Sequence, residues 1–342
     1  MNLSEIRLEA LTDTLRIGKI SDQEYFSKKY SAYVSNSRLG NINPEQGGSP
    51  EKFFTPMGNI FSDSLIMGSA VHQQYLQPEF FELVEIDRPT AKLGFVCDYI
   101  WDHSKDSHEI TEELIIQASQ VVEYYKDSLT EKRVRDITNA YETYRKSRST
   151  YISKKGIEPM FLPPKMYEVA SNCINACNNN EDFKRIMYPP YIEQKPISEN
   201  EQAFLMDIKC NFPDKDPIIV RLKAKLDNYT IDFDSNTITV NDLKTLGAIL
   251  PKFDGEEGNF GKYHYHRELA IYLWLLKIYA EQKYGMKNPH MKVNCLVVST
   301  LPDYYTKVYE VTNKEIDKGF KEFRYLLKLV AYYIAYEGYG LT

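Results

Sequence analysis

The chain has 342 residues, of which 43% are hydrophobic and 26% are charged, as is ordinary for a soluble globular protein. Its net charge of −6 argues mildly against a nucleic-acid-binding protein, although the local distribution of charge decides that point. The five cysteines form no CxxC pair, and their odd number argues against a disulfide framework. The N-terminal segment has no apolar signal region and no stretch approaches 18 apolar residues, so we expect a cytoplasmic protein with no membrane span.

The first part of the chain is predicted to be mainly helical. Residues 2–30 are typical of one or two helices, and residues 33–54 of a loop rich in Gly, Pro and Asn. A helix with a capping Ser or Asp at residues 62–63 follows and is broken by Pro78. Residues 110–190 again show mostly helical patterns.

The rest of the chain alternates between apolar and polar positions and is rich in β-branched residues, which indicates consecutive antiparallel strands. Four strands are expected at EQAFLMDIKC, PIIVRLKAKLD, NYTIDF and NTITVNDLKT, with turns near residues 213–217, 227–228 and 234–236. A long helix over residues 264–284 follows these strands. Two more strands, VNCLVVST and YTKVYEVT, and a final amphipathic helix beginning at NKEIDKGF complete the chain.

These elements predict an α/β fold of the mixed α+β kind, with a central, mostly antiparallel to mixed sheet flanked by helices. No Gly/Ser/Pro-rich linker or low-complexity run divides the chain, so we expect a single domain over residues 1–342. Residues 1–190 would form a mainly helical N-terminal part with a helical insertion. Residues 191–342 would form the sheet core with the catalytic motifs.

A basic stretch lies within the helical part, at residues 131–155. It carries eight Lys or Arg residues against three acids, with three tyrosines interleaved, so it could follow a phosphate backbone. A solvated helix face explains the same pattern at least as well. The candidate DNA-binding residues in this stretch are Lys132, Arg133, Arg135, Arg145, Lys146 and Arg148.

The segment ITVNDLKTLG contains the most informative pair of charged residues. Asp242 and Lys244 share the strand face that Ile238 and Val240 use for apolar packing. Asp227 ends the preceding predicted strand, close to where a hairpin would bring it alongside. Two neighbouring carboxylates need a cation between them, and an oxygen-rich site suits Mg²⁺ or Mn²⁺. A nearby lysine then orients or helps deprotonate a bound water, or stabilises charge on a phosphate.

Two observations count against such a site. Strict alternation places Asp227 on a basic strand face with Lys223 and Lys225, so either that face is the cleft or the chain bulges near Asn228. An isolated D-x-K pattern is also common, and without further support an ion pair on an edge strand is the simpler interpretation.

Further residues of catalytic type occur in a definite order along the chain. His72 lies on a helix, Glu201 opens the first strand of the sheet, and Glu268 and Tyr272 lie one helical turn apart. With these, the chain resembles the PD-(D/E)xK nuclease superfamily, and within it the RecE-like group of exodeoxyribonuclease VIII and phage recombination exonucleases, related to RecB-type nuclease domains. The resemblance covers most of the chain and includes SNSRL, SPEKFF, the G-x-A-x-H of residues 68–72, the L-x-P-x-x-F of residues 76–81, and D-L-K-T at 242–245.

One position departs from the family pattern. The Q-x-x-x-Y helix of the family here has Glu268 in place of Gln, followed by Tyr272. An ionised Glu only accepts hydrogen bonds, whereas Gln also donates them. The change could add a charge that faces a metal, alter how DNA is held, or mark a weakened enzyme.

The resemblance implies a restriction-endonuclease-like core and a Mg²⁺- or Mn²⁺-dependent deoxyribonuclease. It implies an exonuclease that hydrolyses linear double-stranded DNA from a free end, in phage-type recombination or DNA processing, in a bacterial or phage-infected cytoplasm. A homo-oligomer and a single-strand annealing protein are the further partners it suggests. The implied metal ligands are His72, Asp227, Asp242 and the Leu243 carbonyl, with Glu201 as an outer or second-metal ligand, Lys244 positioning the attacking water and Tyr272 steadying the phosphate.

Two other functions stay open. One is a catalytically impaired relative that binds DNA or a protein partner, with Glu268 as a symptom. The other is an unrelated metal-dependent hydrolase that uses His264 and His266, or Asp102 with His103. The hydrolase is disfavoured because helical residues two apart point in different directions, and because Asp102 and His103 have the wrong order for a His-Asp metal pair.

Overall fold

The computed structural model describes residues 3–55, 60–104, 108–125 and 129–341. The chain divides into two compact units. The first contains residues 1–57, 180–297 and 306–342, and the second contains residues 58–179 and 298–305. The single domain expected from the sequence stays a prediction. In the described ranges, no helix is both long and apolar enough to cross a lipid bilayer.

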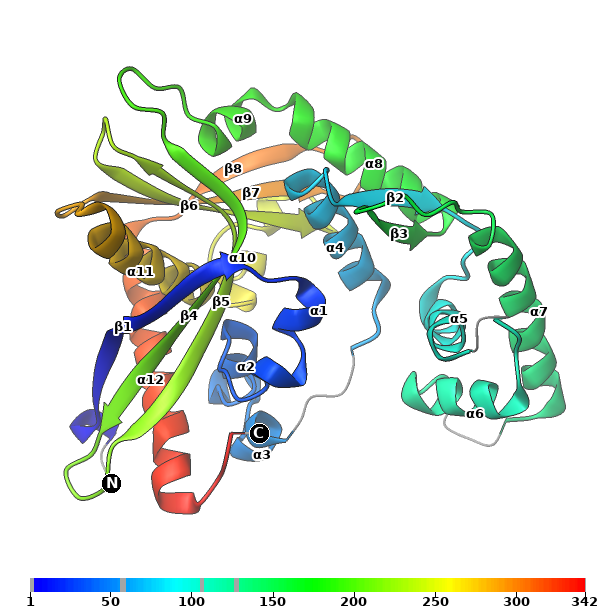
Figure 1. Cartoon of the computed structure of the whole chain (residues 1–342), viewed down its shortest axis with the longest axis horizontal. Helices are drawn as coiled ribbons and strands as arrows, with labels where there is room; N and C mark the ends of the chain where they lie inside the picture. The colour runs from blue at the N-terminus through cyan, green and yellow to red at the C-terminus, as the bar shows by residue number, and fades with distance from the viewer. Residues whose placement is uncertain (1–2, 56–59, 105–107, 126–128, 342) are drawn as a thin grey trace. The chain divides into compact units, whose positions relative to one another are not determined.

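A six-stranded sheet with the order β1-β4-β5-β6-β7-β8 forms the centre of the first unit (Figure 1). The first four strands in this order pair antiparallel. β6 and β7 run in the same direction. The His290 backbone nitrogen donates to the Asn236 carbonyl at the start of both strands, and the Asn294 side chain donates to that of Asn241 further along both. This mixed sheet with flanking helices confirms the predicted fold class. The strands are β1 (Arg7–Lys19), β4 (Ile197–Asn211), β5 (Ile218–Asp232), β6 (Thr237–Leu246), β7 (His290–Ser299) and β8 (Thr306–Glu310).

Two long helices, α11 (Tyr265–Tyr284) and α12 (Asn313–Glu337), pack against each other and against β5 (Figure 1). α12 begins with a capping box formed by Thr312 and Glu315. Gly319 allows the two helices to approach closely, since a Cβ there would lie 2.0 Å from the His266 carbonyl oxygen. The shorter helices of this unit are α1 (Asp22–Tyr25), α2 (Asn36–Gly40), α3 (Pro50–Phe54), α9 (Glu181–Met187) and α10 (Asn259–Lys262), with 3₁₀ turns at Leu3–Glu5, Lys28–Tyr30, Pro44–Gln46 and Leu250–Lys252.

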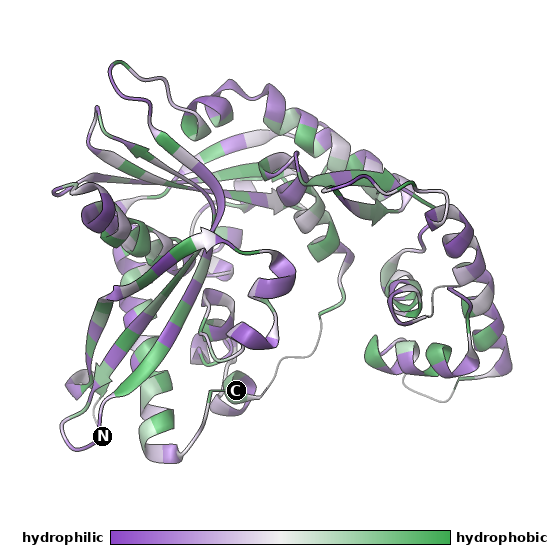
Figure 2. Ribbon diagram, viewed as in Figure 1, coloured by the Kyte–Doolittle hydropathy of each residue, from purple (hydrophilic) through white to green (hydrophobic). Residues whose placement is uncertain are grey.

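The second unit is mainly helical and has its own small hydrophobic core, in which Ile100, Tyr141 and Tyr144 are fully buried. Hydrophilic residues dominate α7 in the view of Figure 2. The elements of this unit are α4 (Asp63–Leu76), α5 (Ala91–His103), α6 (Glu112–Val121), α7 (Glu131–Arg148) and α8 (Pro164–Asn179), with the parallel pair β2 (Phe81–Glu85) and β3 (Glu158–Leu162).

The prediction of helices over residues 2–30 is wrong for Arg7–Lys19, which form the edge strand β1. The pairing of β1 with β4 shifts register between Leu11 and Arg16. Apolar residues that pack on the core occupy even positions before the shift and odd positions after it, for example Leu8 and Ile17. The irregularity interrupts the period of two that marks a strand in a sequence.

The turn predicted at residues 227–228 is also wrong, because β5 continues without a break from Ile218 to Asp232. Core residues of β5 occupy even positions up to Leu226 and odd positions from Tyr229 onward. The pairing with β4 nevertheless keeps its register across this point, and Glu201, opposite the change, has a positive φ of 55°. A change of face inside one strand therefore produced the pattern that resembles two strands.

Candidate active site

Three carboxylates occupy equivalent positions on three neighbouring strands. The pairing of Asn200 with Asn228 and of Asn228 with Asn241 places the next residues, Glu201, Asp227 and Asp242, across from one another on β4, β5 and β6. Carboxylate oxygens of Glu201 and Asp227 lie within 4.8 Å of each other. We call these three residues, Glu201, Asp227 and Asp242, the carboxylate row.

The Lys244 ammonium lies beside the last member of this row. Its Nζ is 3.0 and 2.9 Å from the two carboxylate oxygens of Asp242 and 3.1 Å from Glu268. It also lies 4.7 Å from the ring centroid of Tyr265. Asp242 is only 1% exposed and β6 is an interior strand, so an ion pair on an edge strand is the wrong interpretation.

The electrostatics of this cluster favour an additional cation. Burial, together with the charges of Asp227 and Glu268, raises the pKa of Asp242 well above its usual value despite Lys244. Burial alone would lower the pKa of Lys244, but Asp242 and the neighbouring carboxylates raise it well above its usual value. When Asp227, Asp242 and Glu268 are all ionised, their three negative charges exceed the one positive charge of Lys244 by two, which is the charge of one divalent cation.

The helix α11 contributes two polar groups to the same place. Glu268 and Tyr272 lie one turn apart, and the Tyr272 hydroxyl donates a 3.0 Å hydrogen bond to the Glu268 carboxylate. Burial, followed by the charges of Glu268 and Asp242, raises the pKa of Tyr272 well above its usual value. Tyr272 is therefore a permanent donor, and Glu268 is held between this donor and Lys244.

Asp227 also fixes the backbone of the neighbouring strand. Its carboxylate accepts a 2.8 Å hydrogen bond from the backbone nitrogen of Leu243. The role of the Leu243 carbonyl as a metal ligand stays a prediction. His72 lies on α4, in the second unit, and its role as a metal ligand also stays a prediction.

Lys225 belongs to the site, although sequence reasoning placed it only on a basic strand face. Its Nζ lies 2.7 Å from Glu201 and 2.7 Å from Asp22 of α1. Lys223, two residues earlier, donates a 2.7 Å hydrogen bond to the Tyr25 carbonyl. Burial, with the nearby Arg38 charge, lowers the pKa of Lys223 to about 8. The alternation of Lys223 and Lys225 on β5 was the signal that could have placed Lys225 beside the carboxylates.

The basic stretch of α7 divides into packed and exposed residues. Arg148 packs against the rings of Trp101 and Phe161, at 4.6 and 4.5 Å, and Arg145 pairs with Glu142 at 2.8 Å. Arg133 lies 4.1 Å from the ring of Tyr125. Lys132, Arg135 and Lys146 are exposed. The tyrosines of α7 are buried, so they belong to the core and offer no stacking surface.

His264, His266 and Glu322 form a second cluster, with ligand-type atoms within 4.8 Å of one another. His264 precedes α11 with a left-handed φ of 54°, so the expected divergence of the two histidines on a helix is wrong. Their rings lie 2.8 and 2.9 Å from the Glu322 carboxylate, which also accepts hydrogen bonds from Arg267 and Asn43. Burial opposes ionisation of Glu322, but these donors hold its pKa far below the usual value, so it serves as counter-ion of the buried Arg267.

No family model matches the chain, and no curated protein matches it. A solved structure from Eubacterium rectale, named "Putative exonuclease", is similar at 11% sequence identity, with a TM-score of 0.37. The similarity covers 92% of this chain and 86% of that chain. A likeness this low supports no conclusion about what this chain does.

Proposed function

We propose that this protein is a metal-dependent deoxyribonuclease that uses Mg²⁺ or Mn²⁺. The observation that supports this proposal is the carboxylate row beside Lys244 on interior strands, where the charges of Asp227, Asp242 and Glu268 exceed that of Lys244. Carboxylate oxygens are the ligands that Mg²⁺ prefers. A divalent ion would compensate the excess charge of Asp227, Asp242 and Glu268.

Asp227 and Asp242 would hold the metal, with His72 and the Leu243 carbonyl as the further ligands expected from the resemblance. When bound there, a divalent ion would polarise a phosphoryl oxygen and activate water. Glu201, which is 4% exposed and paired with Lys225, would act as an outer or second-metal ligand.

Lys244 and Tyr272 would act on the reacting groups as hydrogen-bond donors. Because the pKa of Lys244 is raised, this residue stays charged at neutral pH and does not accept the proton of the attacking water. It instead orients that water and stabilises charge on the phosphate. Tyr272 keeps its proton for the same reason and can donate to a phosphate oxygen.

The finer proposal is an exonuclease that acts on linear double-stranded DNA with a free end, in phage-type recombination or DNA processing. Cleavage of end-labelled linear DNA and of closed circular DNA, with and without Mg²⁺, tests it. We expect Mg²⁺-dependent loss of linear DNA only, and no cleavage by Asp242→Asn. Asp232→Asn, on β5 near the Asp234–Asn236 turn, is the matched control and should cleave as wild type does.

One observation favours a second candidate, a catalytically impaired protein that binds DNA. Glu268 already engages Lys244 at 3.1 Å and accepts from Tyr272, so it competes with substrate for both donors. Binding of linear DNA without cleavage at any Mg²⁺ or Mn²⁺ concentration would replace the first proposal with this one.

A further inference from the structure

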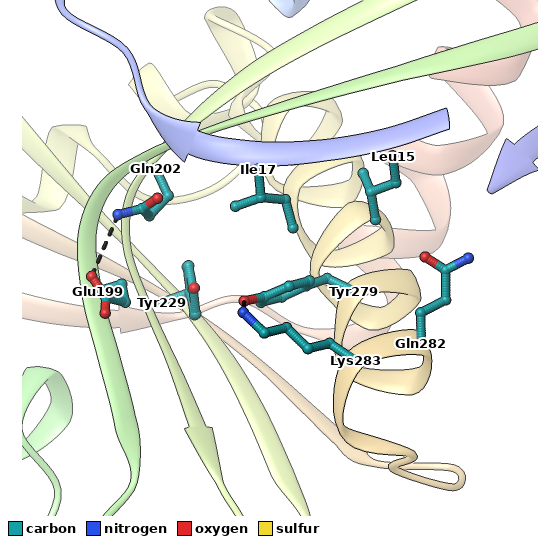
Figure 3. Close-up of a pocket in the computed structure, with 8 residues that line it drawn as sticks. All are labelled: Leu15, Ile17, Glu199, Gln202, Tyr229, Tyr279, Gln282 and Lys283. Atoms are coloured by element: carbon teal, nitrogen blue, oxygen red, sulfur yellow. Dashed lines mark hydrogen bonds between the residues drawn. The ribbon is translucent and has the colours of Figure 1, made fainter. Parts of the chain in front are cut away.

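A pocket with a volume of about 480 Å³ opens on the first unit between β1, β4, β5 and α11 (Figure 3). Figure 3 shows Gln202 and Glu199 on one side and Tyr279 and Lys283 on the other, with Ile17 of β1 above them. None of these side chains belongs to the active site described above.

The walls of this pocket combine aromatic rings with hydrogen-bonding groups. The ring of Tyr279 lies 6.2 Å from that of Tyr229, at an interplanar angle of 78°. The Lys283 ammonium donates a 2.9 Å hydrogen bond to the Tyr279 hydroxyl. Across the pocket, the Gln202 amide lies 3.4 Å from the Glu199 carboxylate, so a donor and an acceptor stand side by side. A ring face with donors and acceptors nearby is the chemistry that recognises an unpaired nucleobase.

The pocket shares three elements, β4, β5 and α11, with the active site. Glu199 and Gln202 flank Glu201 on β4, and Tyr229 follows Asp227 by two residues on β5. Tyr279 follows Tyr272 by seven residues on α11, which is about two helical turns or about 10 Å along the axis. A DNA strand whose phosphate lies at the carboxylates therefore brings a neighbouring base within reach of the pocket.

We propose that this pocket binds one unpaired nucleobase of the DNA strand beside the phosphodiester that is cleaved. The proposal rests on the proposed function, because it places the base relative to the same carboxylates. The base stacks on Tyr279, and its polar edge faces Gln202 and Glu199. Lys283, which is exposed, compensates charge on the adjoining phosphate.

Two variants of one residue separate stacking from other effects. Tyr279→Leu removes the ring, whereas Tyr279→Phe keeps the ring and removes only the hydroxyl. We expect Tyr279→Leu to weaken binding of a single-stranded oligonucleotide about tenfold, in the range measured for loss of one stacked base. Tyr279→Phe should bind nearly as wild type does. Fluorescence anisotropy with the metal chelated measures this binding without cleavage, and thermal melting verifies that both variants fold.

An oligonucleotide series with one abasic site, moved stepwise from the end, locates the bound base. In wild type, one position should lose affinity by about the same factor as Tyr279→Leu, and the variant should show no further loss there. Equal affinity for every member of the series overturns the inference. So does an equal loss in Tyr279→Phe and Tyr279→Leu, which would assign the effect to the hydroxyl contact with Lys283.

The same measurements separate failure of this inference from failure of the proposed function. Normal Mg²⁺-dependent cleavage with unchanged binding by Tyr279→Leu overturns the pocket and leaves the nuclease. Position-specific loss of binding without any cleavage supports the pocket as a base-binding site, but it overturns the nuclease and with it the position of the base beside a cleaved bond. Absence of any single-strand binding by wild type overturns the pocket, and the end-labelled cleavage assay then decides the nuclease by itself.

Discussion

Two rows of residues cross the same strands of the central sheet and differ in one chemical respect. Each residue of the carboxylate row is adjacent in sequence to an asparagine, at positions 200, 228 and 241, and the amide row formed by these asparagines continues to Asn294 on β7. Each amide donates to the next, over 2.8 Å from Asn228 to Asn200, 2.7 Å from Asn241 to Asn228 and 2.9 Å from Asn294 to Asn241. On β6 the two rows point to opposite faces, since Asn241 and Asp242 are adjacent.

The difference between amide and carboxylate groups determines which row needs partners from outside the row. An amide both donates and accepts, so a line of asparagines satisfies itself in a buried place. A carboxylate only accepts, so the carboxylate row depends on Lys225, Lys244 and, in our proposal, a metal. The amide row therefore stabilises the sheet, whereas the carboxylate row is the part for which we propose a catalytic role.

The largest expected effect is the loss of activity on removal of a carboxylate. Asp227→Ala and Asp242→Ala should each abolish Mg²⁺-dependent DNA cleavage and weaken metal binding in calorimetry. Neither should unfold the protein, because each change relieves repulsion between like charges. Normal cleavage by either variant would contradict the two-strand metal site.

Removal of one amide should instead affect stability. Asn241→Leu leaves the Asn228 carbonyl and the Asn294 amide without their partner, at a cost of about 1–3 kcal/mol for each buried group. Urea unfolding measures this cost. Thr239→Val, which removes a buried hydroxyl on the same strand, is the control and should cost less. Equal destabilisation by the two variants would show that the amide row has no special role.

His72→Ala tests whether the carboxylate row takes a ligand from another element. If His72 is a ligand, its loss should weaken metal affinity by roughly ten- to a hundredfold, and high Mn²⁺ should partly restore cleavage. Calorimetric titration with Mn²⁺ measures the affinity. A lower melting temperature with unchanged metal affinity would mark His72 as structural.

Glu268→Gln tests what the negative charge of Glu268, beside the carboxylate row, does to DNA binding and cleavage. Gln still accepts from Tyr272 but no longer pairs with Lys244 as an ion, so Lys244 becomes available to phosphate. We expect tighter DNA binding and a several-fold higher rate, clearest at low salt and low Mg²⁺. The Mg²⁺ dependence of cleavage measures this. A lower rate with a higher Mg²⁺ requirement would make Glu268 a metal ligand, and identical curves would place it and Tyr272 outside the site.

The smallest expected effect concerns α7, far along the chain from both rows. Reversing the exposed Lys132, Arg135 and Lys146 to Glu should weaken DNA binding and flatten its salt dependence, because fewer counterions are released. Cleavage at saturating DNA should change little. The matched control reverses Lys314, Lys321 and Arg324 on α12, which are also exposed. Equal effects of the two triple charge-reversal variants would indicate general charge repulsion and no DNA path along α7.

Sequence by itself determined the elements whose patterns are local. The helix α11, the amphipathic α12 and the strands β4, β6, β7 and β8 follow from the spacing of apolar residues within a few turns or a few residues. The same local pattern placed Asp242 and Lys244 on one strand face, and the structure shows them in contact. Such patterns can be recognised in a sequence because each depends only on near neighbours in the chain.

Only the tertiary structure decided the features that depend on distant partners. β1 and the middle of β5 change face within one strand, so their periodicity misled sequence reasoning until the register with β4 was known. Lys225 lies at the site because its partner Glu201 is on the neighbouring strand. His264 lies beside His266 because His264 itself has a left-handed backbone conformation. Strand register and backbone irregularities are set by contacts between residues far apart in the chain, and a single sequence carries little signal of them.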